Sequence, residues 1–202
     1  MNDLENALAR LLDSSELTGC LASVLGHASE KGGISYEDVL EKAHGKAEDV
    51  LLLADEWRLL LPIRTAKSAA WEDRLLLCEP EEHFEMPHVV TYAVKEAAKT
   101  GNWNPEGAIR RLFKEMGDPD WERVPSLVGR LGEKAENCKI SAAQIGKTCA
   151  EFGLEQRVDM LIAELKASGV MSPKLGSFSE TNREGSPLYE LNPVLYINKI
   201  NN

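Results

Sequence analysis

The chain is short of the features that mark several common classes of protein. Its four cysteines lie far apart and form no CxxC pair. Widely spaced cysteines without a secretion signal predict reduced and mostly buried thiols rather than a disulfide framework. No run approaches the roughly 18 consecutive apolar residues of a membrane helix. Because the N-terminus is acidic and amphipathic rather than basic and apolar, we expect a cytoplasmic protein with no membrane partner.

Recognisable catalytic motifs are also missing. The sequence contains no GxSxG, P-loop, GxGxxG or HExxH motif, and its carboxylates are scattered. Cys78, His83 and His88 form a C-x4-H-x4-H run, but this spacing is not that of a zinc finger or zinc ribbon. An acidic connector with incidental histidines explains the run better. We therefore expect a protein that is not an enzyme and that holds no metal and no cofactor.

Positive charge is scarce in the first part of the chain. Residues 1–90 contain 8 Lys and Arg against 18 Asp and Glu, a net charge of −10. Residues 91–202 contain 15 of each, a net charge of zero. Proteins that bind nucleic acids usually neutralise phosphates with lysine and arginine. The N-terminal half is therefore poorly suited to DNA, whereas the C-terminal half permits DNA binding without being basic.

What the sequence does contain is helical periodicity, interrupted by short strands. Apolar residues recur at helical spacing before Gly32-Gly33, which ends the first of these helices. Ile34 is a lone apolar residue, and Ser35 after it has the character of a helix N-cap. The N-terminal part is expected to form three helices and then two strands, at residues 17–31, 36–43, 46–57, 59–64 and 74–78.

A second segment repeats this order of elements. Three helices and two strands are expected at residues 124–136, 142–152, 155–168, 170–175 and 188–191. Identity between the two segments is low, so the match is one of pattern. Ile34-Ser35 corresponds to Ile140-Ser141, Val39 to Ile145, Leu53 and Trp57 to Leu161 and Leu165, and Pro62 to Pro173.

Two further helices are expected between the repeated segments, at residues 87–99 and 105–116. Each would have one apolar face. Such helices could form a connector packed on one or both segments, or they could form a dimerisation helix. Both alternatives need the same apolar face, so the sequence leaves them open.

The repeated segments resemble winged helix-turn-helix domains. One set of matching residues is Ile34-Ser35-Tyr36-Glu37-Asp38-Val39-Leu40 with 47–57 and 59–62, and the other is Ile140-Ser141-Ala142-Ala143-Gln144-Ile145 with 157–165 and 170–173. The resemblance covers about three quarters of the chain and is at the level of the superfamily. It implies a mainly α fold with small β-wings (α+β). Winged helix units at residues 1–86 and 122–202 would be joined by a helical connector at residues 87–121.

The resemblance also implies a function. In winged helix proteins that bind DNA, the third helix enters the major groove and the wing contacts phosphate or the minor groove. The chain would then be a transcriptional regulator that binds double-stranded DNA mainly through its C-terminal unit, as a homodimer. The implied contact residues are polar side chains of the last two helices and of the loop between the strands: Gln144, Lys147, Thr148, Gln156, Arg157, Lys166, Lys174, Asn182 and Arg183.

The acidic third helix of the first unit favours a different function. Its carboxylates, Glu48, Asp49, Asp55 and Glu56, would repel phosphate. This helix is therefore either a protein-binding surface or a solubilising face. The alternative function is a protein-interaction or scaffold module in which the winged helices bind protein partners. Trp71 and Trp103 would be exposed at an interface, or would fill the joint between the units.

Overall fold

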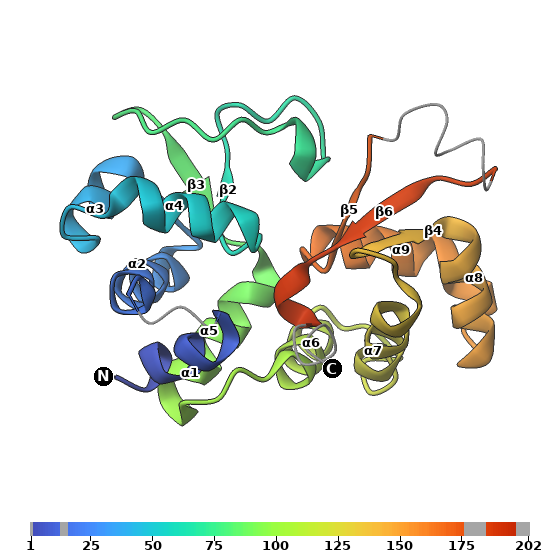
Figure 1. Ribbon diagram of the computed structural model, residues 1–202. Coiled ribbons are helices and arrows are strands. Elements are labelled where there is room, and N and C mark those ends of the chain that lie inside the picture. Colours follow the sequence, from blue (N-terminus) through green and yellow to red (C-terminus); the bar gives the residue numbers. More distant parts are fainter. Residues whose placement is uncertain (1, 13–15, 176–184, 197–202) are drawn as a thin grey trace.

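The computed structural model describes residues 2–12, 16–175 and 185–196. Two groups of helices and strands lie side by side, the first coloured blue to green and the second yellow to red (Figure 1). The chain is mainly helical with two small antiparallel sheets, which confirms the predicted α+β class. We call residues 18–86 the first half and residues 124–195 the second half.

The first half follows the predicted order of helices. Gly32, with φ of +78°, ends the first of these helices, and the side-chain oxygen of Ser35 accepts a hydrogen bond from the amide of Asp38. The sheet has the order β1-β3-β2. The elements are α2 (Thr18–Lys31), β1 (Gly33–Ser35), α3 (Tyr36–Lys42), α4 (Ala47–Glu56), β2 (Leu61–Pro62), the 3₁₀ turn η1 (Trp71–Asp73) and β3 (His83–Glu85).

The last strand of the first half lies later in the chain than predicted. Residues 74–78 form no strand, and β3 pairs with both β1 and β2 instead, with Ile34 opposite Phe84. A strand on a half-buried sheet needs alternation of buried and exposed side chains. Exposed His83 and buried Phe84 provide it, whereas the Leu75-Leu76-Leu77 run does not. The prediction was therefore wrong because it followed the richest apolar run.

The second half has the predicted elements, including both predicted strands. Ser141 caps its middle helix through a capping box, in which Gln144 bonds back to the Ser141 amide. The sheet has the order β4-β6-β5, equivalent to that of the first half. The elements are α7 (Val124–Lys134), β4 (Lys139–Ser141), α8 (Ala142–Glu151), the 3₁₀ turn η2 (Glu155–Arg157), α9 (Val158–Ala167), β5 (Met171–Pro173), β6 (Leu188–Leu191) and the 3₁₀ turn η3 (Pro193–Leu195).

The two halves correspond, with one correction to the predicted alignment. Ile34 pairs with Phe84 as Ile140 pairs with Tyr189, and the prolines 62 and 173 lie opposite these same two aromatic residues. The predicted match of Leu53 and Trp57 to the buried Leu161 and Leu165 is wrong. The buried residues of α4 are three positions earlier, because 16 residues separate the starts of α8 and α9 (142 to 158) but only 11 separate those of α3 and α4 (36 to 47). The residues equivalent to Leu161 and Leu165 are Val50 and Ala54.

Three further helices, α1 (Asp3–Leu12), α5 (His88–Thr100) and α6 (Pro105–Glu115), join the halves into one body. With α7 they form a row beneath the two sheets in Figure 1. Helix α1, which was not among the predicted elements, buries one apolar face against α2 and α5. The buried apolar residues of both halves and of these helices form one continuous core. The connecting helices are therefore part of that core.

Candidate interaction surfaces

Three of the residues predicted to contact DNA make contacts inside the molecule. The Gln144 side-chain oxygen accepts a hydrogen bond from the Ser141 amide at 3.1 Å, as part of the capping box. Thr148 is fully buried, and its hydroxyl donates to the Gln144 carbonyl oxygen at 2.8 Å. Lys174 places its ammonium group 2.7 Å from the carboxylate of Glu72 in the first half. The expected solvent placement of Thr148 is therefore wrong, and Gln144 and Lys174 already have internal partners.

Arg157 was expected on the solvent face of the third helix, and this placement is also wrong. Its side chain is only 18% exposed. The guanidinium lies 2.7 Å from the fully buried carboxylate of Asp118, bonds to Asp120 and approaches Glu164 at 3.5 Å. Arg157 ends η2, directly before α9, so its side chain reaches the loop between α6 and α7 instead of solvent. It stabilises the attachment of α9 to the connecting helices.

The carboxylates around Arg157 form a coupled group. Burial, and then the hydrogen bond to Asp118, raise the pKa of Glu164 to about 7. Burial also opposes ionisation of Asp118, but hydrogen bonds from Arg157 and from the Asp120 amide outweigh it and hold the Asp118 pKa below its usual value. Near pH 7 the Glu164 carboxyl is therefore about half protonated, beside an ionised Asp118.

The remaining predicted residues divide into two groups. Lys147, Gln156 and Lys166 are exposed on α8, η2 and α9, as predicted. Asn182 and Arg183 lie outside the described residues. The second half therefore presents two lysines and a glutamine near its third helix rather than the larger basic surface that DNA binding would favour.

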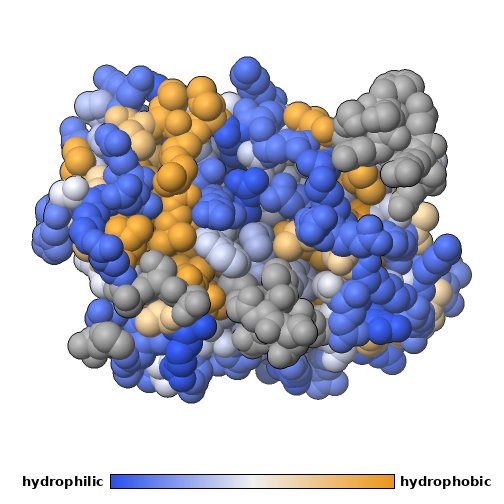
Figure 2. Space-filling view, viewed as in Figure 1, coloured by the Kyte–Doolittle hydropathy of each residue, from blue (hydrophilic) through white to orange (hydrophobic). Residues whose placement is uncertain are grey.

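The third helix of the first half presents a different surface. Glu48, Asp49 and Glu56 of α4 are exposed, and between them Leu52 is 62% exposed. Figure 2 shows a band of hydrophobic residues on this side of the molecule, running over α4 and the segment above it. The carboxylates of this surface were predicted, whereas the exposed Leu52 was not.

The segment after η1 extends this surface. Leu75 is 64% exposed. Burial, and then the negative charge of Glu48, raise the pKa of the Cys78 thiol, which places the segment near the first turn of α4. We call this region, which includes the exposed Leu52 and Leu75 and the exposed Glu48, Asp49 and Glu56, the α4 surface. It combines exposed apolar side chains with negative charge.

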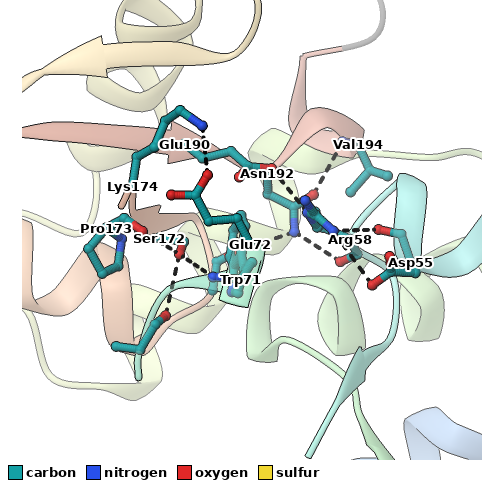
Figure 3. Close-up of polar contacts among 12 residues, drawn as sticks. Asp55, Arg58, Trp71, Glu72, Ser172, Pro173, Lys174, Glu190, Asn192 and Val194 are labelled. Atoms are coloured by element: carbon teal, nitrogen blue, oxygen red, sulfur yellow. Dashed lines mark hydrogen bonds and ion pairs between the residues drawn. The ribbon is translucent and has the colours of Figure 1, made fainter. Parts of the chain in front are cut away.

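A polar network holds the two halves together (Figure 3). Arg58, at the end of α4, places its Nε 3.0 Å from the Glu190 carboxylate of β6 and its Nη1 3.5 Å from Asp55. The buried amide of Asn192 donates to the carbonyl oxygen of Arg58 at 3.2 Å and to that of Gly169 at 3.3 Å. One side chain thus satisfies the turn after the third helix in each half.

A tryptophan fills the same joint. The Trp71 amide donates to the Ser172 hydroxyl at 2.9 Å, and Trp71 is only 5% exposed. Trp103 is half-buried, and its indole Nε1 donates to the Val194 carbonyl at 3.0 Å. The expectation of an exposed Trp71 is therefore wrong, and the alternative, that it fills the joint between the halves, is confirmed. These contacts fix the α4 surface relative to the second half.

Neither a metal-binding cluster nor an activated thiol is found in the described part of the chain. There, no three histidine, cysteine or acidic side chains lie close enough together to hold a metal ion. Burial raises the pKa of the thiols of Cys78, Cys138 and Cys149, which disfavours the reactive thiolate. No described helix has both the length and the apolar character needed to cross a membrane.

Comparison with known proteins gives one match. A protein-family model matches residues 2–199, which span both halves and the helices between them. No curated protein matches the chain, and no solved structure matches it. The family match therefore concerns the whole arrangement rather than one half of it.

Proposed function

From the premise that the chain belongs, over residues 2–199, to this protein family of unknown function, we propose that it is a tandem winged helix-turn-helix protein whose units bind protein partners. Each half has the order helix, strand, two helices and two strands, and each sheet has the same strand order. This topology supports the assignment of β2–β3 and β5–β6 as wings. The proposed role is non-enzymatic.

The observation that carries the proposal is the chemistry of the α4 surface. In a winged helix protein that binds DNA, the third helix enters the major groove, which the phosphates line on both sides. Here that helix exposes three carboxylates and a leucine. Carboxylates at this position repel phosphate, whereas an exposed apolar centre with a polar edge is typical of protein interfaces. The function follows from this site and not from the fold alone.

The joint between the halves supports the same role. Contacts of Arg58, Ser172 and Asn192 hold both units in one orientation. A rigid pair of units can present two surfaces at a fixed separation, as a scaffold requires. Lys174, which the second wing would offer to phosphate, bonds to Glu72 of the first unit instead.

DNA binding by the second unit is the second candidate function. The exposed Lys147, Gln156 and Lys166 favour it, because they lie on or beside the helix that would enter the major groove. Two lysines per unit would give a weak site, so this function would depend on a homodimer that doubles the contacts. Homodimerisation and regulation of transcription belong to this candidate.

A titration with random double-stranded DNA separates the two functions. Fluorescence anisotropy is measured as salt is raised from about 0.05 to about 0.3 M. We expect little binding and therefore no steep salt dependence. Binding that falls steeply with salt, and that is lost in Lys147→Gln/Lys166→Gln, would overturn the protein-binding proposal in favour of the DNA-binding one.

The protein-binding proposal has its own direct test. Wild type and Leu52→Gln/Leu75→Gln are used as baits under identical conditions, and the proteins retained are quantified by mass spectrometry. Both leucines are exposed, so the variant should fold normally. Proteins enriched by wild type and lost from the variant are the expected result. Identical sets for the two baits would contradict the proposal.

A further inference from the structure

The α4 surface has the composition of a groove that accepts one amphipathic helix. Leu52 and Leu75 come from different elements and are the most exposed large apolar residues described in the first half. Partly buried Leu53 and Leu76, which pack on the core, lie next to them in the chain. Figure 2 shows an elongated band of hydrophobic residues over α4 and the segment above it. An elongated apolar strip matches the i, i+3, i+4, i+7 face of a helix.

The charges around this strip indicate the sign of the charge that its partner should carry. Two lysines that precede α4 in the chain are already paired, Lys42 with Glu41 at 2.7 Å and Lys46 with Glu16 at 3.0 Å. Within the described residues, no lysine or arginine forms an ion pair with Glu48, Asp49 or Glu56. These carboxylates therefore leave the edge of the strip negatively charged, and their field extends beyond the protein surface.

We propose that the α4 surface binds a basic amphipathic helix of a partner protein, with leucine-like residues over Leu52 and Leu75 and lysine or arginine beside Glu48, Asp49 and Glu56. This inference rests on the proposed function and specifies its partner. Complementary charge orients the helix and speeds its association, while burial of the leucines supplies the affinity.

Other occupants fit the charge less well. A second copy of the chain would bring an equally acidic first half, since residues 1–90 carry a net charge of −10. Nucleic acids and anionic lipid surfaces are negatively charged, as are the carboxylates at the edge of the strip, and are therefore repelled. Residues 91–202 carry no net charge and therefore add no overall attraction to an acidic surface of a second copy.

The probe is a synthetic amphipathic helix of leucine and lysine, about 18 residues long so that it is helical when bound. Two matched helices replace lysine with glutamine or with glutamate. Binding is measured by isothermal titration calorimetry with the full chain. We expect the lysine helix to bind with a micromolar dissociation constant, the glutamine helix about tenfold more weakly, and the glutamate helix not at all.

Variants locate the binding site. Leu52→Gln/Leu75→Gln should weaken binding of the lysine helix at least tenfold. Glu48→Gln/Asp49→Gln should weaken it about threefold and flatten its salt dependence. The matched control is Met116→Gln, since Met116 is a 43% exposed apolar residue at the end of α6. The control should bind like wild type, and thermal unfolding should be the same for all four proteins.

The possible results distinguish a failure of the basic-helix proposal from a failure of the proposed protein-binding function. Equal binding of the lysine and glutamine helices, lost in the leucine variant, would keep protein binding but overturn the basic partner. Binding of the lysine helix that survives the leucine variant would be unspecific attraction and would overturn the site. A dimer in light scattering that dissociates in the leucine variant would identify a second copy as the occupant and would also overturn it.

Discussion

The turn that follows the third helix is left-handed in both halves, at Arg58 with φ of +53° and at Gly169 with φ of +76°. In the first half this position carries a long side chain that reaches Glu190 of the second half. In the second half it carries no side chain, because Pro87 packs directly against it. The same backbone turn thus serves the joint in two ways, which shows that the repeated topology has been adapted position by position.

The surfaces beside this turn differ as strongly. Leu52 and its neighbouring carboxylates face solvent in the first half. In the second half the residue directly before the third helix, Arg157, faces inward onto Asp118. The first half therefore leaves its third helix open to binding partners. The second half uses the residue before its third helix for contacts within the molecule. Equal folds do not imply equal functions.

Replacing Arg157 with glutamine should have the largest effect on this comparison. The fully buried Asp118 would lose its cationic partner, and breaking a buried ion pair from one side costs about 4 kcal/mol. Denaturant unfolding should show this loss of free energy of unfolding. Lys166→Gln, on the exposed side of α9, is the control and should change stability by less than about 0.5 kcal/mol. Near-wild-type stability of Arg157→Gln would mean that the ion pair contributes little to folding, and that Arg157 is available to an external ligand.

Substitution of Gly169 tests the joint from the other side. An alanine Cβ there would lie 2.5 Å from the Pro87 Cβ, in a left-handed backbone that alanine disfavours. We expect Gly169→Ala to lose about 3 kcal/mol of unfolding free energy. Gly153→Ala is a matched control, because Gly153 has φ of +67° with nothing within 4 Å of its added Cβ. Gly153→Ala should lose only about 1 kcal/mol of unfolding free energy. Similar losses at both sites would mean that the contact with Pro87 contributes nothing to the effect of Gly169→Ala.

The coupled carboxyl pair predicts a pH dependence that belongs to the second half. The pKa of Glu164 is raised to about 7 in the folded chain, so its contribution is present below about pH 4.5 and is lost as the pH rises through 7. The lowered pKa of Asp118 acts in the opposite sense and reduces the net effect. Glu164→Gln keeps a donor to Asp118 without the titration, so it should exceed wild type by about 2 kcal/mol at pH 8.

At pH 4.5 the Glu164→Gln variant and wild type should have nearly equal stability, because Glu164 is then protonated in the folded chain. The check is the free energy of unfolding measured by denaturant at several pH values. A difference that does not change between pH 4.5 and 8 would mean that Glu164 titrates normally.

Local chemistry made much of the fold predictable. Helices appeared where apolar residues recur at helical spacing, and Gly32 and Ser141 end or begin helices as glycine and serine should. The positions of the short strands were harder to predict. The run of three leucines at 75–77 led to a predicted strand there rather than around the single Phe84. The strand forms at Phe84 because this buried residue alternates with exposed neighbours and the leucines do not.

The candidate sites were harder to predict than the fold. Whether Arg157 faces solvent depends on Asp118, which lies 39 residues away in the chain, so no local pattern contains that information. Leu52 presents the opposite difficulty, since its exposure depends on the exact rotation of α4 about its axis. A shift of three positions in the alignment of α4 with α9 was enough to replace fully buried residues by partly buried ones.

The smallest expected effect tests whether the halves are equivalent at the start of their middle helices. The Ser35 hydroxyl accepts from the Asp38 amide at 3.1 Å, and that of Ser141 accepts from the Gln144 amide at 3.2 Å. Ser35→Ala and Ser141→Ala should each lower the free energy of unfolding by about 1 kcal/mol, measured by denaturant. The third residue of each helix also bonds back to the serine, Asp38 through its carboxylate and Gln144 through its amide oxygen, so neither cap has a clear advantage. A loss at Ser141 that clearly exceeds the loss at Ser35 would show that the buried capping box stabilises the second half by more than its hydrogen bonds, and the resemblance of the two caps would then be geometric rather than energetic.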